Sequence, residues 1–263
     1  EIKTGAAYID EKAIVDPAAQ IGAGSTIGPY VKIGPNVKIG SRCQIGASAV
    51  IDGLTEIGDE TIVYPMASIG LAPQDLKYKG EKNSLIIGSN NIIREYVTIN
   101  PGTEGGGNVT SIGNNCLFMI SSHIAHDCQV GNNIIFANSA TLAGHVHVGD
   151  WAIFAGFTGA HQFCHIGAHS FIGMNSLTNK DIPAYTMASG QPVTPRGVNT
   201  EGLKRRNFSS EEINNIKNAY RILYRSELTL AQAISELEKL VENQPELLIF
   251  LESLKQSNRG IIR

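Results

Sequence analysis

Residues 21–51 read IGAGSTIGPYVKIGPNVKIGSRCQIGASAVI, with isoleucine at every sixth position. Glycine follows most of these isoleucines, and a small or β-branched residue stands four positions after each, as in Ser25, Val31 and Cys43. A short fixed period of this kind is typical of a β-solenoid. Each unit supplies one short strand and one corner, and both the large aliphatic side chain and the small one point inward. Glycine suits corners that need positive φ.

The period runs from Ile21 to Ile69, resumes at Ile87–Ile99, and runs again from Ile112 to Ile172. Three units close a triangular coil of 18 residues, whose neighbours stack about 4.8 Å apart through parallel hydrogen bonds. The 23 units predict between seven and eight coils. An ordinary sandwich would show turns every 8–12 residues or so instead.

Two segments, 71–84 and 101–109, interrupt the period and are polar and glycine-rich. Loops that leave a regular scaffold often carry function. The period ends near residue 183, so we expect a mainly β solenoid domain over 1–183. A proline-rich connector and a helical domain would fill 184–263, with helices expected over 209–226, 229–243 and 245–257, which carry apolar residues at helical spacing.

Composition excludes some functions. The net charge of −3 argues against a strongly basic nucleic-acid binder. The sequence contains no apolar run of about 18 residues, so it predicts no membrane span. The first residues do not resemble a signal peptide.

The four cysteines, Cys43, Cys116, Cys128 and Cys164, occupy the small-residue position of the repeat. We therefore expect buried thiols in a reducing cytoplasm rather than disulfides or zinc ligands.

The segment SSHIAHDCQVGN, residues 121–132, places titratable groups in the scaffold. With 18 residues per coil, His126 stacks on Gly144 and Gly144 on Gln162, while Asp127 stacks on His145. His123 and His161 lie close by, so four histidines and one acid are expected on one edge of the prism. Asp127 can reach His126 directly only if a corner falls between them, because adjacent strand residues face opposite sides; contact with His145 is its alternative role.

Three interpretations of this cluster compete. The side chains are merely surface or interface groups, or they bind zinc as in a γ-carbonic-anhydrase-like hydratase, or they act in general-base catalysis. In the last case an imidazole takes a proton from a hydroxyl nucleophile, a carboxylate orients it, and the Gly144 N–H faces a developing oxyanion. A non-catalytic solenoid such as an ice binder would need flat threonine arrays, which the outward residues do not supply.

The segments HIAHDCQVGN, ATLAGHV, GAHQFCHIGAHSFIGMNS, QDLKYKGE and GVNTEGLKRRNFS, together with the hexapeptide repeat, resemble the UDP-N-acetylglucosamine O-acyltransferase family. The resemblance implies a left-handed parallel β-helix, a homotrimer and a cytoplasmic enzyme. It implies transfer of an R-3-hydroxyacyl chain from acyl carrier protein to the 3-hydroxyl of UDP-N-acetylglucosamine, in the first step of lipid A biosynthesis. No metal or other cofactor is expected, since phosphopantetheine arrives on the carrier protein. Another sugar-nucleotide acyltransferase with the same repeat is the nearest enzyme alternative.

The resemblance also assigns residues. His126 would be the general base, Asp127 its orienting acid and Gly144 the oxyanion donor. The expected substrate-binding residues are Asp75, Lys77, His123, His145, His161, Gln162, Asn199, Glu201, Arg205 and Arg206. Met174, in a column with Asn138 and Gly156, matches the far end of the acyl groove, so we expect it to shorten the acyl chain accepted. Its alternative role is a gap filler away from the groove.

A basic cluster near the start of the helical region fits an acidic carrier protein. It comprises Lys204, Arg205, Arg206, Arg221 and Arg225. Opposite charge on the two proteins would steer their encounter.

Overall fold

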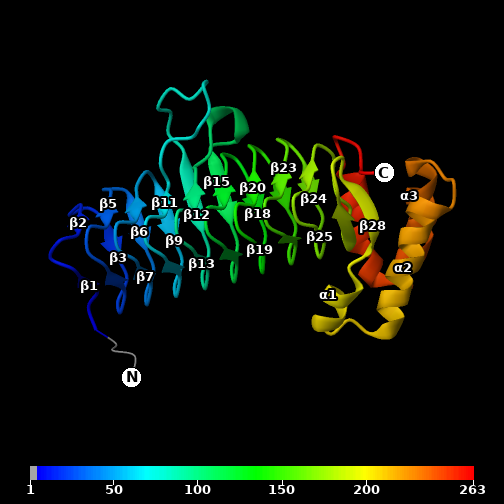
Figure 1. Ribbon diagram of the computed structural model, residues 1–263, viewed down its shortest axis with the longest axis horizontal. Coiled ribbons are helices and arrows are strands. Elements are labelled where there is room, and N and C mark those ends of the chain that lie inside the picture. The colour runs from blue at the N-terminus through cyan, green and yellow to red at the C-terminus, as the bar shows by residue number, and fades with distance from the viewer. Residues whose placement is uncertain (1–4) are drawn as a thin grey trace.

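The computed structural model describes residues 5–263 (Figure 1). A parallel β-solenoid of about ten turns occupies most of the chain and helices follow it, so the predicted fold class is confirmed; the coil is left-handed. Left-handed crossovers are an exception to the usual preference, and the periodic spacing alone did not specify the hand.

Three parallel sheets form the faces of the prism. The first sheet contains β1 (Tyr8–Ile9), β4 (Thr26–Ile27), β7 (Gln44–Ile45), β10 (Ile62–Val63), β13 (Ile92–Ile93), β16 (Leu117–Phe118), β19 (Ile135–Phe136), β22 (Ile153–Phe154) and β25 (Phe171–Ile172). The second contains β2 (Ile14–Val15), β5 (Lys32–Ile33), β8 (Val50–Ile51), β11 (Ser68–Ile69), β14 (Thr98–Ile99), β17 (His123–Ile124), β20 (Thr141–Leu142), β23 (Gly159–Ala160) and β26 (Leu177–Thr178). The third contains β3 (Gln20–Ile21), β6 (Val37–Ile39), β9 (Thr55–Ile57), β12 (Ser84–Ile87), β15 (Val109–Ile112), β18 (Gln129–Val130), β21 (His147–Val148) and β24 (His165–Ile166).

Strand register follows the 18-residue coil where no loop intervenes, as in the pairing of His123 with Thr141 and of Gln129 with His147. The expected number of coils was too low. The solenoid already begins at β1 and β2 and continues to β26. Ile9 is 44% exposed and Thr178 is polar, so the ends of the solenoid lack the buried aliphatic residue that identifies a unit from sequence.

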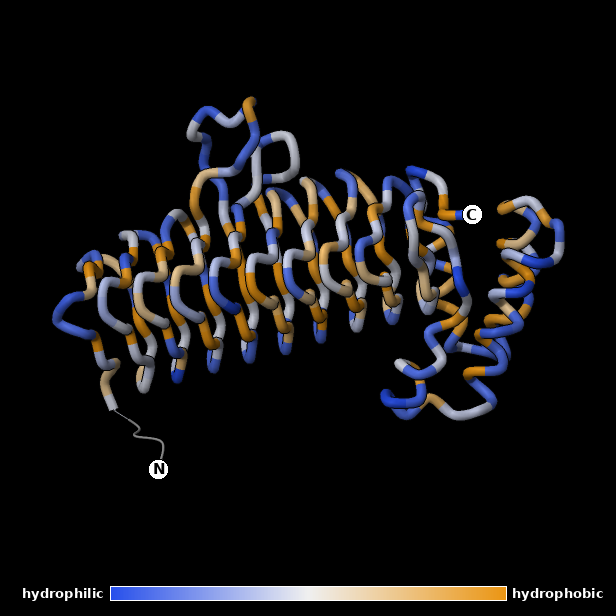
Figure 2. Tube along the Cα trace, in the orientation of Figure 1, coloured by the Kyte–Doolittle hydropathy of each residue, from blue (hydrophilic) through white to orange (hydrophobic). Residues whose placement is uncertain are grey.

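Large inward side chains fill the core, and the same positions recur from coil to coil, as the repeated orange segments of Figure 2 show. Phe118, Phe136 and Phe154 stack along the first sheet, with successive ring centroids 5.3 and 4.5 Å apart. The four cysteines are buried free thiols, as predicted. Burial raises the pKa of Cys116 to about 11 and those of Cys128 and Cys164 to about 12, so these thiols are poor nucleophiles.

The chain turns corners between sheets with residues in the left-handed region, and the three corners define three edges. The His126 edge joins the second and third sheets, the Trp151 edge joins the third and first, and the Met174 edge joins the first and second. Asp127 (φ 60°), Trp151 (φ 64°) and Asn175 (φ 55°) are the turning residues at these points.

Beyond the last coil, β27 (Thr186–Ser189) joins the first sheet and pairs with β28 (Thr194–Val198) in an antiparallel hairpin. Helices α1 (Thr200–Arg205), α2 (Ser210–Arg225), α3 (Leu230–Val241), η2 (Pro245–Leu247) and α4 (Leu248–Lys255) follow. The three predicted helices are thus present, and α1 is an addition. Capping boxes at Ser209 and Thr229 begin α2 and α3. Among residues 5–263, none of the helices is long and apolar enough to cross a bilayer.

Candidate functional site

Two loops leave the solenoid, and both leave it at the His126 edge. Residues 70–83 lie between β11 and β12, and residues 100–108, which contain η1 (Glu104–Gly106), lie between β14 and β15. They project together from one side of the prism (Figure 1). A bond from the side-chain amide of Asn83 to the Gly102 carbonyl, 2.7 Å long, ties one loop to the other. The edge that carries the histidines therefore also carries both insertions.

His126 and Asp127 are in direct contact. The positive φ of Asp127 places a corner between them, and the Nδ1 atom of His126 lies 2.7 Å from Oδ2 of Asp127. The Asp127 side chain is fully buried and that of His126 is 14% exposed. This contact answers the question that the sequence left open. Since a carboxylate only accepts hydrogen bonds, Nδ1 carries a proton, and in the neutral ring the Nε2 atom of His126 then has a free lone pair.

The second ring nitrogen of His126 faces Gly144, as the coil arithmetic predicts. A Cβ atom placed on Gly144 would lie 2.5 Å from Cε1 and 2.7 Å from Nε2 of His126. The glycine thus leaves open the space beside the basic nitrogen. Within residues 5–263, the Gly144 N–H donates no hydrogen bond, although the neighbouring Ala143 and His145 N–H groups do. A donor and a base therefore border the same space.

Asp127 is held by a residue of the second loop that the repeat did not reveal. The Thr103 N–H donates to Oδ1 of Asp127 at 2.8 Å, and the Thr103 hydroxyl donates to Oδ2 at 2.6 Å. The backbone N–H of Asp127 donates to the Thr110 hydroxyl at 2.8 Å. Residue-by-residue periodicity has no information about a loop that leaves the coil, so the only available signal was the glycine-rich composition around Thr103.

His145 and His123 flank the pair. The His145 Nε2 lies 3.8 Å from Oδ2 of Asp127, its ring meets that of His126 edge-on at 5.0 Å, and it stacks on Phe163 at 4.4 Å. Burial lowers the pKa of His145, and the charge of Asp127 opposes that effect. Burial, with a smaller contribution from His126, lowers the pKa of His123, whose Nδ1 lies 2.7 Å from the Thr98 hydroxyl.

His161 and Gln162 lie at the same edge, one coil beyond Gly144 and His145. The His161 Nδ1 is 3.2 Å from the Gln162 carbonyl oxygen. His161 also lines a groove of about 660 Å³ on the outer face of the second sheet. The groove continues over Gly159 and Leu177 toward Pro192, and Phe157 borders it. A largely apolar groove thus lies beside the histidine cluster.

Asp75 and Lys77 lie in the first loop, where the Lys77 N–H donates to Oδ1 of Asp75 at 2.9 Å. Burial is the largest influence on the pKa of His145 and lowers it, whereas the negative charge of Asp75 raises this pKa slightly. The loop therefore reaches the vicinity of the histidine cluster within one chain.

The four residues expected near the nucleotide lie on the Trp151 edge instead. Asn199 caps α1 and is 5% exposed; its side chain accepts from the Gly202 N–H and donates to the His169 carbonyl. Glu201 pairs with Lys204 at 2.9 Å, and Arg205 lies at the end of the same helix. One chain therefore does not bring these residues to His126.

Arg206 is the most constrained residue of that group. Its guanidinium lies 5.2 Å from the centre of the Trp151 ring, and it donates to the Trp151 carbonyl at 3.1 Å. A second nitrogen lies 3.2 Å from Nδ1 of His169. Burial, followed by the charge of Arg206, lowers the pKa of His169 to about 4, so the imidazole stays neutral beside the cation.

Met174 lies on the Met174 edge and is 68% exposed. The column of Asn138, Gly156 and Met174 is present as predicted, since Asn175 donates to the Gly156 carbonyl and Phe157 to that of Asn138. Met174 is not among the described residues that line the groove; it stands on the edge beyond the groove's far side.

A metal site requires separate consideration. One ligand atom each from His126, Asp127 and His145 lie within 4.8 Å of one another. Both Asp127 oxygens, however, already accept hydrogen bonds from Thr103, and Oδ2 also accepts one from His126. A zinc ion would therefore have to bind a carboxylate that three hydrogen bonds already hold in place.

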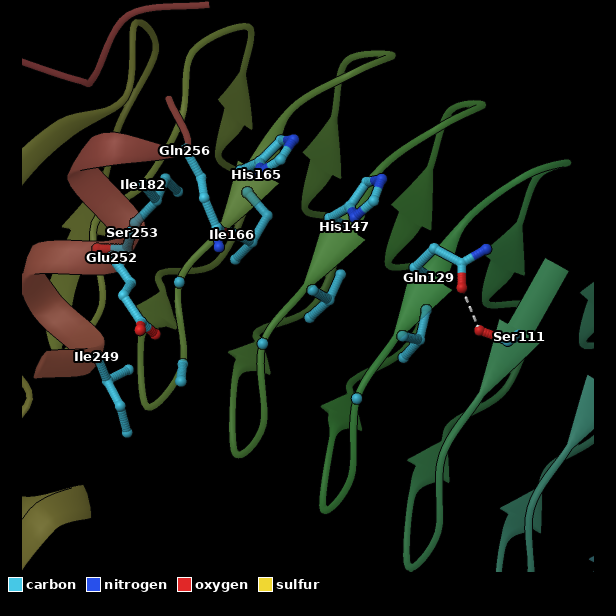
Figure 3. A pocket seen from close by; sticks show the side chains of 16 residues that line it. Ser111, Gln129, His147, His165, Ile166, Ile182, Ile249, Glu252, Ser253 and Gln256 are labelled. Carbon is cyan, nitrogen blue, oxygen red and sulfur yellow. Dashed lines mark hydrogen bonds between the residues drawn. The ribbon is translucent and has the colours of Figure 1, made fainter. Parts of the chain in front are cut away.

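A further cavity of about 380 Å³ lies between the outer face of the third sheet and α4 (Figure 3). His147 and His165 stack there with ring centroids 4.6 Å apart, and Glu252 of α4 and Gln256, which follows that helix, line the opposite side of the cavity. His126, Asp127 and Gly144 do not line this cavity. It is a separate feature of the third face.

Comparisons with known proteins identify the family of the chain. Residues 181–262 match the family described as UDP-N-acetylglucosamine O-acyltransferase, domain 2, and residues 7–53 and 110–144 match the bacterial transferase hexapeptide family. The acyl-[acyl-carrier-protein]--UDP-N-acetylglucosamine O-acyltransferase of Xanthomonas axonopodis pv. citri is 52% identical over 214 residues, which are 81% of each chain.

Solved structures are similar over nearly the whole chain. LpxA from Acinetobacter baumannii is 45% identical with a TM-score of 0.95, and covers 97% of this chain and 99% of its own. LpxA from Bacteroides fragilis, a UDP-N-acetylglucosamine acyltransferase, is 43% identical with a TM-score of 0.93 and the same coverage. The chain therefore belongs to the UDP-N-acetylglucosamine O-acyltransferase family.

Proposed function

We propose that this protein transfers an R-3-hydroxyacyl chain from acyl carrier protein to the 3-hydroxyl of UDP-N-acetylglucosamine, the first step of lipid A biosynthesis. The contact of His126 with Asp127, which turns the free Nε2 toward Gly144, is the observation that carries the proposal. The names of relatives at about 52% identity supply the substrate class.

The geometry supports the following reaction. The Nε2 atom of His126 accepts the proton of the sugar hydroxyl as its oxygen bonds to the thioester carbonyl carbon. The carbonyl electrons move to oxygen, and the N–H of Gly144 donates to that oxyanion. When the intermediate collapses, the carbon–sulfur bond breaks and His126 returns the proton to the sulfur. Asp127 keeps the proton on Nδ1 and stabilises the imidazolium.

The groove supplies a site for the acyl chain. It starts at His161 and runs across the second sheet toward the Met174 edge, past the exposed side chains of Phe157 and Leu177. We propose that Met174 limits the chain length from the far end, while His123, His145, His161 and Gln162 position the reacting groups. Asp75 and Lys77 would contact the sugar from the loop.

The positions of Asn199, Glu201, Arg205 and Arg206 favour a homotrimer. They lie at the Trp151 edge, and the third face separates them from the His126 edge of the same chain. A neighbouring chain would bring its Trp151 edge to this chain's His126 edge, and its two arginines would bind the diphosphate. Each cleft would then use residues from two chains.

We propose that the chemistry uses no metal and no resident cofactor, because phosphopantetheine arrives with the carrier protein. Occupation of both Asp127 oxygens by Thr103 donors supports this over a zinc hydratase. Metal analysis of the purified protein distinguishes the two: about one zinc per site would favour the hydratase. A cytoplasmic location follows from the proposed carrier-protein and nucleotide-sugar substrates.

Incubation with UDP-N-acetylglucosamine and a panel of hydroxyacyl carrier proteins tests the function, with His126→Ala as control. We expect an O-acylated sugar nucleotide from the parent and a loss of at least about 100-fold in kcat from the variant. Parental turnover by the variant under saturating conditions, or no acylated product from the parent, would contradict the proposal.

A further inference from the structure

The buried carboxylate of Asp127 accepts two of its three hydrogen bonds from a residue outside the solenoid. Thr103 is 4% exposed, and it supplies one donor to each oxygen of Asp127. The hydroxyl donates to Oδ2, the same oxygen that accepts from His126. The orientation of the carboxylate plane, and with it the direction of the His126 ring, therefore depends on a loop residue.

Backbone hydrogen bonds within the second loop, and between the two loops, hold Thr103 in place. The Thr103 carbonyl accepts from the Gly106 N–H at 3.0 Å and from the Asn108 N–H at 2.9 Å, which closes a tight turn. Gly102 donates to the Ser84 carbonyl at 3.2 Å, and its own carbonyl accepts from Asn83. These bonds fix the base of the second loop to the end of the first.

Gly106 shows why the loop can approach so closely. A Cβ atom on Gly106 would collide with the carboxylate of Asp127. Its φ is not in the left-handed region, unlike that of Gly107. Space rather than backbone conformation therefore requires glycine at position 106. The loop backbone packs against the carboxylate and shields it from water.

We propose that Thr103 is a positioning residue for the acyl transfer, acting through Asp127 on His126. This inference rests on the proposed function. Hydrogen bonds to an ionised group are stronger and more directional than neutral ones, so the threonine fixes the Asp127 oxygen in line with Nδ1–H. The first loop, which carries Asp75 and Lys77, is linked to the same residue through Asn83 and Gly102, so the sugar-binding loop and the base share one support.

The test compares Thr103→Val, which is close in shape but lacks the hydroxyl, with Thr103→Ser, which keeps it. We expect the valine variant to lose roughly ten-fold or more in kcat, with KM for UDP-N-acetylglucosamine within about two-fold of the parent. The serine variant should recover most of the loss. In an Asp127→Asn background the valine substitution should cost almost nothing more, because contacting residues are not additive.

Thr61→Val is the matched control. Thr61 is fully buried at a corner that joins the third and first sheets, not at the His126 edge, and its hydroxyl donates to the Gly88 carbonyl at 3.4 Å. It should lose thermal stability but keep the parental kcat per folded molecule. If Thr103→Val does not fold, Thr103→Ala carries the same comparison.

Parental kcat in the valine variant, a serine variant no better than valine, or full additivity with Asp127→Asn would overturn the inference. Failure of the parent to acylate UDP-N-acetylglucosamine would contradict the proposed function instead, so the two failures are distinguishable.

Discussion

The Nδ1 atom of His126 lies 2.7 Å from Oδ2 of Asp127, although the two residues are adjacent in a chain built of β-strands. The corner between them, made by the positive φ of Asp127, turns both side chains toward the same space. Asp127→Asn keeps the shape but allows an amide to donate toward Nδ1, which favours the wrong tautomer. In serine proteases the equivalent change costs about 10⁴-fold, so we expect roughly 10³-fold loss in kcat here.

The control for Asp127→Asn is Asp59→Asn. Asp59 accepts from the Ser41 N–H, and the same position in later coils is filled by Asn114 and Asn132. That substitution should leave the rate unchanged. Steady-state kinetics with a saturating acyl donor measure both variants, and equal rates for the two would argue against a role of the carboxylate in orienting His126.

Gly144→Ala should inactivate the protein without unfolding it. The new methyl group would lie 2.7 Å from the Nε2 atom of His126, where the sugar hydroxyl must sit, and it would shield the adjacent N–H. The φ of Gly144 is not in the left-handed region, so the backbone accepts alanine. We expect about 100-fold lower kcat/KM and a melting temperature within a few degrees of the parent. Retained activity would place the reacting oxygen elsewhere.

Met174→Gly should shift the preferred donor to longer acyl chains. Each additional buried CH₂ contributes about 0.8 kcal/mol, so a longer donor should gain several-fold in kcat/KM for every methylene that the missing side chain admits. Because Met174 is 68% exposed, stability should change little. Competition between donors of graded length measures the preference, and an unchanged profile would assign Met174 a role outside the groove.

Reversing charge at Arg221 or Arg225 should weaken the reaction with the carrier-linked donor. These residues line a groove of about 470 Å³ with Lys217 and Tyr220, whereas Lys204 and Arg206 of the predicted basic cluster are engaged by Glu201 and by Trp151. The Arg221→Glu variant should raise KM for the acyl carrier protein several-fold, and the effect should shrink at high salt.

Two controls accompany the charge reversal. An acyl-pantetheine donor, which has no protein surface, should react equally with Arg221→Glu and the parent. Lys12→Glu, at the opposite end of the solenoid, should have no effect with either donor. Unchanged kinetics of Arg221→Glu and Arg225→Glu with the intact carrier protein would move the docking surface elsewhere.

Acid should destabilise the protein in part through His169. Its pKa in the folded state is about 4, compared with the ordinary 6.5, because of burial and Arg206. Below pH 6.5 the unfolded chain binds this proton and the folded one does not, so stability falls as pH drops from 6.5 to 4. The contribution is at most about 3 kcal/mol at pH 4.

His169→Gln removes that titration. Urea unfolding of parent and variant at fixed protein concentration should show a smaller loss between pH 6.5 and 4.5 for the variant. His123, His145 and His147 also have lowered pKa values, but they are present in both proteins and cancel in the difference. Parallel curves would show that His169 is not the source.

The six-residue period by itself determined the solenoid and the vertical neighbours of each residue. Stacking of His126 beside Gly144 follows because parallel strands repeat every coil at a fixed register. Helices α2 to α4 were equally predictable, since their apolar residues recur at helical spacing and serine, threonine or proline marks their starts.

Tertiary structure decided what the period does not encode. The backbone conformation of one corner residue, Asp127, determined which histidine its carboxylate contacts. Thr103 reaches that carboxylate because a loop outside the repeat folds back on the edge, and no register rule applies to a loop. The separation of Arg206 from His126 likewise depends on how the chain after the last coil returns along the prism, a long-range packing that local sequence patterns do not specify.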